Sequence, residues 1–357
     1  MAMTEPAHAG EGTQRRADAA RLKAFAENVL AAAGVGRADV AIVADCLVAA
    51  NLMGVDSHGV VRLAHYVRRL ENGTIKMHPT LRFERSAPAL GLLDGNDGLG
   101  HVVTWEACTR AMELARECGS GTVVVHNSSH FGMAGFYVRR MVAEGYVGIV
   151  MTATDALLIP YGARQPFFGT NPLAIGFPTD GIPVVVDMAT TSIPYGKVAL
   201  ARTEGRPIPP DWGFDAHGHP TTDPLQLAGL HPIAGPKGSG LAMMIDIFCS
   251  ILTGMAWGPH INAMYREMDQ PRKLGHFVMA LDLARLMDPA LFKQRLADML
   301  REFGQLEPAE GHARVYYPGQ LEGERSQERA AQGIPIDPGL WQELGALGQR
   351  LRVPFLE

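Results

Sequence analysis

The spacing of apolar residues divides the chain into a helical beginning and a longer region in which strands and helices alternate. Before residue 80, apolar positions recur every three or four residues, which predicts helices over 17–33, 37–52 and 59–71. From residue 89 onward, short apolar runs are separated by helical patterns. The runs predict strands at 89–93, 122–125, 147–153, 173–177, 184–187 and 277–281, and the patterns predict helices at 102–117, 134–144, 238–252, 289–303 and 339–351.

Alternating strands and helices normally indicate a parallel doubly wound sheet, but two features argue against a Rossmann fold. The glycines of segment 95–100 have the reverse of the GxGxxG spacing that such folds use for a phosphate loop. The runs at 173–177 and 184–187 are separated by Pro178 and Gly181, which is typical of a hairpin and requires antiparallel pairing. The pattern therefore predicts an α/β protein with a mixed sheet.

Composition narrows the class of protein. The 357 residues exceed one typical core, so two or more domains are expected. The net charge of −5 gives no support for a nucleic-acid partner, and the four cysteines show no CxxC or zinc spacing. Residues 1–16 lack an apolar signal core and are expected to be a disordered tail, and the apolar stretch 241–255 is too short to span a bilayer. These features predict a cytoplasmic protein without a membrane partner.

The segment 54–66 carries the most informative side chains. His58, Arg62 and Tyr66 follow one another at intervals of four residues, so a continuous helix would place all three on one stripe. A proton-transfer group, a carboxylate clamp and a hydroxyl on one stripe suit a small oxyanionic substrate. The alternative is an ordinary helix start in which Asp56 or Ser57 is the N-cap.

A second histidine follows the predicted strand at 122–125. His130 lies in the loop Asn-Ser-Ser-His-Phe-Gly, and loops at strand ends often carry functional side chains. An imidazole titrates near neutral pH, so His130 is a candidate general acid or base. The alternative is a histidine satisfied by backbone groups. Asp155 follows the next strand, and adjacent strands would bring this carboxylate beside His130, where it would orient the ring.

Three glycine-rich or hydroxyl-rich loops are candidates for cofactor binding. Segment 161–172 exposes backbone amides together with Thr170 and Asn171, which suits a phosphate or a nicotinamide amide, or it is a plain turn. Thr190 and Thr191 either bind a diphosphate at a helix N-terminus or cap that helix. The loop 235–240 lacks the GxxxxGK[ST] spacing of a nucleotide-hydrolysing enzyme.

Two other groupings do not support a further activity. Asp56, Ser57 and His58 are consecutive, so their side chains are expected to diverge and not to form a hydrolase triad. His217 and His219 lie in a glycine-bounded turn without a third ligand nearby, so no metal site is expected.

Taken together, the motifs resemble the malate/L-lactate dehydrogenase family that is unrelated to Rossmann-type enzymes. The motifs GVDSHGVVRLAHYVRRLENG, NSSHFG, FGTNPLAIGFP, VVDMATT, GPKGSGLAMMIDI and YYPGQ occur in the family order between residues 17 and about 337. The resemblance implies a homodimer with a mixed, largely antiparallel sheet flanked by helices, across which NAD(P) lies extended. It also implies that a helical region, 17–80, packs with the C-terminal helix at about 337–357, while 81–336 binds the cofactor and the substrate.

The resemblance also implies roles for individual residues. His130 matches a proton acceptor, His58 a proton donor, and Asp155 a carboxylate near the catalytic histidine. Arg62 and Tyr66 match substrate-contacting positions, and the neighbouring Ser57 is expected to contact the substrate too. The remaining matches are cofactor-binding positions, namely Thr154, Asp187, Met188, Ala189, Lys237, Gly238, Tyr317, Pro318 and Gly319.

The implied reaction is hydride transfer between a nicotinamide and C2 of a small 2-hydroxy or 2-oxo acid. The C-terminal half, through GPKGSGLAMMIDI, INAMYREMD and VYYPGQ, is most similar to ureidoglycolate dehydrogenases, which convert ureidoglycolate to oxalurate with NAD. The loops Ser-His-Phe-Gly and Asp-Ser-His-Gly depart from that subgroup and are closer to the family at large. Malate, lactate or sulfolactate oxidation, NADPH-dependent reduction of a cyclic ketimine carboxylate and a non-catalytic binding module are the alternatives, and NADP is an alternative to NAD.

Overall fold

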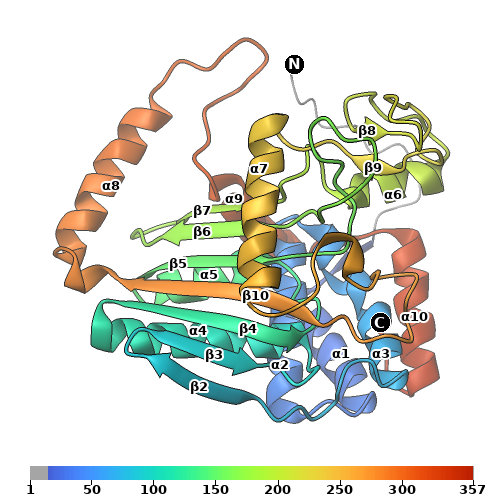
Figure 1. Cartoon of the computed structure of the whole chain (residues 1–357), viewed down its shortest axis with the longest axis horizontal. Coiled ribbons are helices and arrows are strands. Elements are labelled where there is room, and N and C mark those ends of the chain that lie inside the picture. The colour runs from blue at the N-terminus through green and yellow to red at the C-terminus, as the bar shows by residue number, and fades with distance from the viewer. Residues whose placement is uncertain (1–14, 357) are drawn as a thin grey trace.

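A seven-stranded mixed sheet forms the centre of the structure, a computed structural model that describes residues 15–356 (Figure 1). Only β3 and β4 pair in parallel, and every other neighbouring pair in this sheet is antiparallel. The prediction of a mixed, largely antiparallel sheet is therefore confirmed. In spatial order the strands are β2 (Arg82–Ala87), β3 (Leu90–Asp94), β4 (Ser120–Ser128), β10 (Leu274–Asp282), β5 (Tyr146–Thr152), β6 (Leu173–Phe177) and β7 (Val184–Met188).

The central strand comes from late in the chain. β10 lies between β4 and β5 and runs antiparallel to both of them. β4 and β5 therefore point the same way and end at one edge of the sheet, where β10 begins. As a result, the loops after β4 and β5 and the segment before β10 converge at this edge.

Helices cover both faces of the sheet. On one face lie α4 (Gly100–Cys118) and α5 (Ala134–Ala143), whose apolar sides bury Val103, Ala111 and Val138 against the strands. On the other face lies α7 (Pro236–Asp246), which continues through a π-helical turn at Ile247–Ile251. Each large apolar side chain buried in these layers contributes about 2 kcal/mol to the free energy of unfolding.

The two ends of the described chain lie together. The apolar faces of α1 (Ala19–Ala32), α2 (Arg37–Leu52) and α3 (Leu63–Glu71) form one core with α10 (Pro338–Leu351). Strand β1 (Arg15–Ala17) pairs with β11 (Ile334–Ile336) beside this core. The predicted tail 1–16 is thus wrong for residues 15 and 16, which are in a strand, and residues 1–14 lie outside the described part.

The elements that the apolar pattern did not predict have few apolar residues or are short. β2 is largely exposed, and α9 (Gln320–Gln332) buries only Gly323. The others include α6 (Tyr195–Glu204) and the short strands β1, β8 (Gly213–Phe214), β9 (Gly229–Leu230) and β11. An element without an apolar stripe gives no periodic signal in the sequence.

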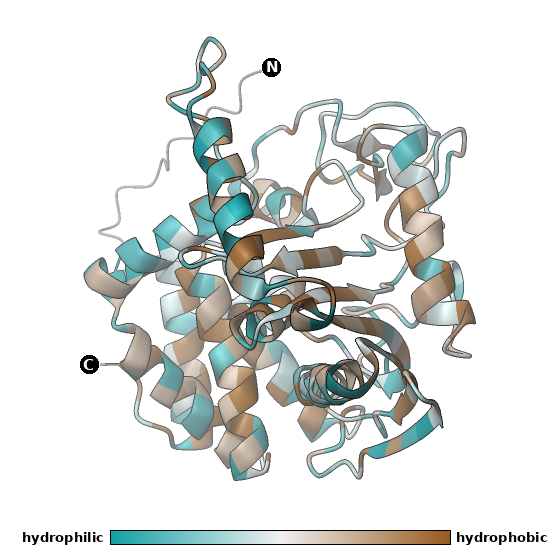
Figure 2. Cartoon of the chain, turned by 90° about the vertical axis from the view of Figure 1, so that its left-hand side faces the viewer, coloured by the Kyte–Doolittle hydropathy of each residue, from teal (hydrophilic) through white to brown (hydrophobic). Residues whose placement is uncertain are grey.

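One helix touches the sheet near its beginning, where Phe292 stacks on Phe177 and Lys293 pairs with Asp180. α8 (Pro289–Gly304) extends away from the sheet and buries none of its residues (Figures 1 and 2). Within residues 15–356, no helix is both long enough and apolar enough to cross a membrane.

Candidate active site

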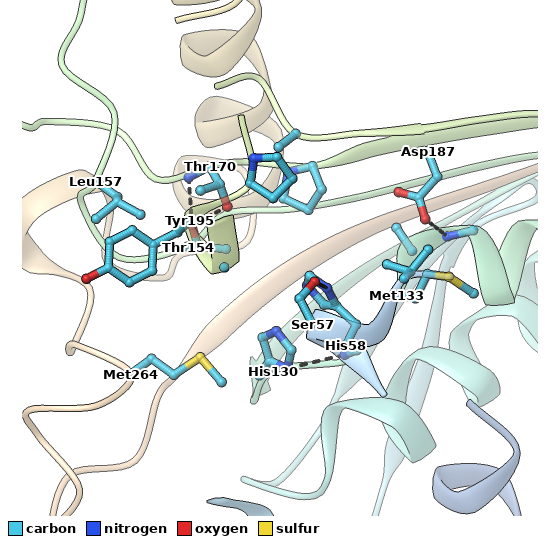
Figure 3. A pocket seen from close by; sticks show the side chains of 18 of the residues that line it. Ser57, His58, His130, Met133, Thr154, Leu157, Thr170, Asp187, Tyr195 and Met264 are labelled. Atoms are coloured by element: carbon cyan, nitrogen blue, oxygen red, sulfur yellow. Dashed lines mark hydrogen bonds between the residues drawn. The ribbon is translucent and has the colours of Figure 1, made fainter. Parts of the chain in front are cut away.

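A cavity of about 1420 Å³ lies where the two strand-end loops meet the turn 54–62 and the loop 259–272 (Figure 3). Its volume exceeds that of most small-molecule sites and suits a dinucleotide together with a small acid. The predicted site residues that line it are Ser57, His58, Arg62, His130, Thr154, Asp155, Thr170, Asp187, Ala189, Tyr317, Pro318 and Gly319. Those that do not line it are Tyr66, Asn171, Met188, Lys237 and Gly238.

The turn that carries His58 is not part of a continuous helix. The chain forms two 3₁₀ turns, Asp56–His58 and Val60–Arg62, and α3 begins only at Leu63. Gly59 interrupts the helix because its backbone is extended, with φ −84° and ψ −153°. The position needs glycine, since a Cβ here would lie 2.2 Å from Oδ1 of Asn51. The predicted helix over 59–71 is therefore shorter than expected, and the stripe from 58 to 66 does not run along one helix.

The 3₁₀ turn lets neighbouring side chains meet. Oγ of Ser57 and Nδ1 of His58 are 3.0 Å apart, so the expectation that these side chains diverge is wrong for this pair. Asp56 does point elsewhere, since its carboxylate accepts hydrogen bonds from Asn51 and Arg329. The three consecutive residues therefore do not form a triad among themselves.

The two histidines lie face to face in the cavity. The ring centroids of His58 and His130 are 5.8 Å apart with nearly parallel planes. Nδ1 of His130 lies 2.7 Å from Oη of Tyr66 and accepts a hydrogen bond from the backbone N–H of Gly132 at 3.3 Å. Only Nε2 of His130 is left to meet a ligand. Gly132 has φ +77°, and a Cβ there would collide with His101 and Cys46, so this donor position requires glycine.

Burial keeps both rings neutral near pH 7. Burial, together with the neighbouring Arg62, lowers the pKa of His58 to about 4. Burial also lowers the pKa of His130 well below its usual value, and His58 and Arg62 add to the effect. A neutral imidazole can accept a proton, which is the form that a general base needs.

Arg62 is placed to bind an anion. Its Nε donates to the backbone oxygen of Ser57 at 2.6 Å, and its guanidinium lies over the ring of Tyr265, 5.6 Å from the centroid. No carboxylate within the described residues forms an ion pair with Arg62. A guanidinium that lines a cavity without an acidic partner suits a substrate carboxylate.

Asp155 does not orient His130, contrary to expectation. β10 lies between β4 and β5, so the strands that precede the two residues are not adjacent, and Arg272 enters just before β10. Oδ1 of Asp155 accepts from Nη2 of Arg272 at 2.7 Å, and Oδ2 accepts from the backbone N–H of Met264 at 3.3 Å. Asp155 therefore holds Arg272 and the loop 259–272, and Tyr66 takes the place beside His130.

This loop is fastened from α3 as well. The guanidinium of Arg69, only 1% exposed, donates to the backbone oxygens of Met264 and Gln270 at 2.7 and 3.0 Å. The peptide groups of Met264 are thus held from both sides, by Asp155 and by Arg69. The wall of the cavity near Arg62 depends on these buried charges.

We expect Asp155→Asn to lower the free energy of unfolding by about 3 kcal/mol, because it leaves the buried guanidinium of Arg272 without its carboxylate. Thermal or urea unfolding measures the loss. Asp180→Asn is the matched control, since Asp180 pairs with Lys293 on the surface and should change stability by less than about 1 kcal/mol. Equal stability of Asp155→Asn and the wild type would contradict this role.

Tyr66 is also placed differently from the expectation. It is fully buried behind His130 and does not line the cavity, so contact with a substrate is replaced by its hydrogen bond to His130. The helix α3 turns this residue inward, where it packs among apolar side chains.

The far part of the cavity has polar groups suited to a dinucleotide. Oγ1 of Thr154 accepts from the backbone N–H of Thr170 at 2.9 Å, and both residues line the cavity. Asp187 accepts from the N–H of Gly135 at 2.7 Å, and burial raises its pKa to about 6. Arg139 lies beside Gly319 at the cavity wall and provides a cation for a diphosphate. These groups and the volume fit NAD(P).

Several predicted cofactor residues have other roles in the structure. Asn171 is fully buried and holds Thr154, Ala242 and Asp246 by side-chain hydrogen bonds. Gly238 packs directly on Ile233. Met188, Lys237 and Gly238 all lie outside the cavity lining.

Thr190 and Thr191 do not meet a helix N-terminus. Their hydroxyls donate to the backbone oxygens of Thr170 and Ile193, and α6 begins only at Tyr195. The expectation that these threonines lie at the start of a helix, as diphosphate ligands or as caps, is therefore wrong, since Pro194 is the N-cap of α6.

The cavity lining also contains residues that were not predicted, and four of these bear on the chemistry of the site: Arg139, Met264, Tyr265 and Arg272. Met264 and Tyr265 lie in the motif INAMYREMD, and this motif was the available signal for them. Arg139 lies in a helix with ordinary surface spacing, and nothing in the sequence distinguishes it.

Comparison with known proteins identifies the family. Residues 17–345 match the family model described as malate/L-lactate dehydrogenase. The chain is 35% identical over 319 residues to a protein named ureidoglycolate dehydrogenase (NAD⁺) from Escherichia coli K12, covering 89% of this chain and 91% of that one. It is also 35% identical over 346 residues to a malate dehydrogenase from Pyrococcus abyssi, covering 94% and 95%. The structure of malate dehydrogenase from Entamoeba histolytica superposes with a TM-score of 0.92 at 31% identity, covering 96% of this chain and 100% of that one.

The family match spans nearly the whole described chain, and the similar proteins cover it almost end to end. Their names describe dehydrogenases of 2-hydroxy acids, and the cavity holds two imidazoles and a guanidinium suited to such substrates. The chain belongs to the malate/L-lactate dehydrogenase family and is a dehydrogenase.

Proposed function

We propose that the enzyme oxidises ureidoglycolate to oxalurate with NAD. The observation that carries the reaction type is the convergence of His58, His130 and Arg62 on one cavity wall. The choice of substrate is supported by the similarity to the Escherichia coli protein and by the C-terminal motifs. Malate and sulfolactate dehydrogenases of the family are similar to the same degree, so the substrate needs a direct test.

In this proposal His130 is the general base. Nε2 of His130 removes the proton of the substrate hydroxyl, while Arg62 binds the carboxylate and fixes C2 in the cavity. His58 lies on the other side of the hydroxyl oxygen and polarises it or relays its proton, and Ser57 orients His58 through Nδ1. Burial keeps both imidazoles neutral and so ready to accept a proton.

NAD, when bound, supplies the nicotinamide that takes the hydride from C2. Thr154, Thr170, Asp187, Ala189 and the segment 317–319 would hold it. We infer NAD rather than NADP from the name of the Escherichia coli relative.

The test is a side-by-side assay of the purified protein with ureidoglycolate, malate, lactate, sulfolactate and a cyclic imino acid, each with NAD(H) and NADP(H). We expect the highest kcat/KM for ureidoglycolate with NAD. Preference for malate, lactate or sulfolactate would make the enzyme a sister dehydrogenase, and preference for the imino acid with NADPH would make it a reductase. No binding of either nicotinamide in a fluorescence titration would favour a non-catalytic module.

We expect Arg62→Met to raise the KM for the acid substrate about 10- to 100-fold, because the variant loses charge-assisted hydrogen bonds to the carboxylate. Binding of NAD should stay within about twofold of the wild type. The measurement is steady-state kinetics at saturating NAD with a separate fluorescence titration of the cofactor. An unchanged KM would remove Arg62 from the clamp.

We propose further that the enzyme is a cytoplasmic homodimer. α7 and the turn after it expose a row of large apolar side chains and form the largely brown ribbon at the right of Figure 2, and α8 buries none of its residues. Such a patch indicates a protein interface, and a second copy would cover it. Light scattering should give twice 38.5 kDa. The row is Met243, Met244, Ile247, Phe248, Ile251 and Leu252.

The four cysteines agree with a reducing compartment. All are free thiols, and three of them are buried.

A further inference from the structure

We propose that Tyr66 is the positioning residue that decides which nitrogen of His130 carries a proton. The inference rests on the proposed role of His130 as the base. Tyr66 lies behind His130 on the side away from the cavity, with Oη 2.7 Å from Nδ1 and ring centroids 6.0 Å apart. Since Tyr66 is fully buried and absent from the cavity wall, it acts through His130 and not on the substrate.

The two hydrogen-bond partners of Nδ1 differ in the tautomers of His130 that they permit. The backbone N–H of Gly132 can only donate, so it favours a ring whose Nδ1 has a free lone pair and whose Nε2 carries the proton. That tautomer cannot take a proton at Nε2. The hydroxyl of Tyr66 can donate or accept, because its O–H bond rotates. Tyr66 is therefore the partner that permits the tautomer with a proton on Nδ1, which leaves Nε2 free as a base.

The same hydroxyl is needed once the proton has moved. In the oxidation, the O–H bond of the substrate breaks, an Nε2–H bond forms, and the hydride from C2 passes to the nicotinamide. His130 then carries protons on both nitrogens, and Nδ1–H donates to Oη of Tyr66. Burial raises the pKa of Tyr66, so this residue keeps its own proton throughout. The proton on Nε2 finally leaves to water when the product departs.

No other group near His130 is suited to this task. The charged and titratable groups that face it from the neighbouring elements are His58, Arg62, His101 and Arg272. The two guanidiniums oppose a positive charge on the ring, and the two buried imidazoles are neutral near pH 7. His101 packs edge-on against Tyr66, with 4.9 Å between the ring centroids, and so fixes the phenol in place. Tyr66 thus occupies the position that a carboxylate holds beside many catalytic histidines.

The direct test is the tautomer of His130, read from ¹⁵N chemical shifts of histidine-labelled protein at pH 8. In the wild type we expect a measurable fraction of the ring with the proton on Nδ1. In Tyr66→Phe we expect the ring to carry its proton on Nε2 alone. A wild-type ring wholly protonated on Nε2 would overturn the proposal, and this measurement needs no variant.

Kinetics give the second readout. We expect Tyr66→Phe to lower kcat for oxidation about 10- to 100-fold, because the protonated ring loses its acceptor. The KM of the acid and the Kd of NAD should change by less than about twofold. The acid limb of kcat/KM should move to lower pH, since a ring without this acceptor binds its proton less tightly. A raised KM with unchanged kcat would instead place Tyr66 in contact with the substrate.

Tyr137→Phe is the matched control. Tyr137 is also fully buried, and its hydroxyl donates to the backbone oxygen of Phe131, next to His130 in the chain. Its loss should cost stability as Tyr66→Phe does, yet leave the acid limb and the tautomer in place. If Tyr66→Phe and Tyr137→Phe shift the acid limb and the tautomer equally, Tyr66 has only a structural role. Failure of the proposed function would show differently, as absence of turnover in the wild type.

Discussion

Replacing His130 by alanine should lower kcat about 1000-fold while NAD binds as tightly as before. General acid–base catalysis by a positioned side chain contributes about 10²- to 10⁴-fold, and His130 is the imidazole whose free nitrogen faces the cavity. Stopped-flow or steady-state kinetics with saturating acid and NAD measure the loss, and a fluorescence titration measures cofactor binding. The expected loss corresponds to about 4 kcal/mol of transition-state stabilisation.

Two features of this experiment separate catalysis from folding. The free energy of unfolding of His130→Ala should lie within about 2 kcal/mol of the wild-type value, because the side chain borders a cavity and is not a core residue. The matched control is His217→Ala, a change in an exposed turn far from the cavity lining, which should leave kcat unchanged. Retained turnover in His130→Ala would transfer the role of base to His58.

The protein should unfold between about pH 6 and pH 4.5. Burial, the largest cause in each case, lowers the pKa of His58 to about 4 and those of His65, His101 and His276 to about 3, and it lowers that of His130 well below 6.5. At pH 5 these rings stay neutral in the folded state but bind protons in the unfolded chain. The full stability is therefore present above pH 6.5 and is lost as the pH falls.

The size of this effect is comparable with the whole stability of a typical domain. Each of the four rings of His58, His65, His101 and His276 costs about 2 kcal/mol at pH 5 by linkage, so together they cost about 8 kcal/mol, and His130 acts in the same direction. Asp187 acts in the opposite direction, since its raised pKa means that the folded state binds its proton more tightly than the unfolded chain.

Urea unfolding at a series of pH values measures the dependence. His101→Leu is the informative variant, because it removes a buried ring whose two nitrogens have no hydrogen-bond partner among the described residues. Between pH 7 and pH 5, the free energy of unfolding of this variant should decrease by about 2 kcal/mol less than that of the wild type. Equal wild-type stability at these two pH values would contradict the buried neutral rings.

The fold was largely predictable where apolar spacing is strong. α2 and β6 have the predicted bounds, and the helices α4, α5, α8 and α10 differ by one or two residues at their ends. The hairpin of β6 and β7 excluded a wholly parallel sheet in advance. α9 could not be predicted, because its thirteen residues bury a single glycine and show no apolar stripe.

The candidate site was predictable in its residue types but not in its pairings. His58, Arg62 and His130 converge as expected, because two of them are near in sequence and the third follows a strand that ends at the same edge. The partner of Asp155 was not predictable, since it depends on β10 entering the sheet between β4 and β5. The role of Tyr66 depends on the direction in which α3 turns its side chains, and the change from 3₁₀ turns to α-helix at Leu63 sets that direction.

The placement of β10 has a consequence for how the chain folds as it is made. Until residues 274–282 have left the ribosome, β4 and β5 have no strand to join them, and the sheet remains in two halves with unpaired edges. Such nascent halves expose backbone groups and apolar side chains that favour aggregation. Cooperative folding must therefore wait for the last quarter of the polypeptide, and synthesis that stops before β10 should yield chains that depend on chaperones or are degraded.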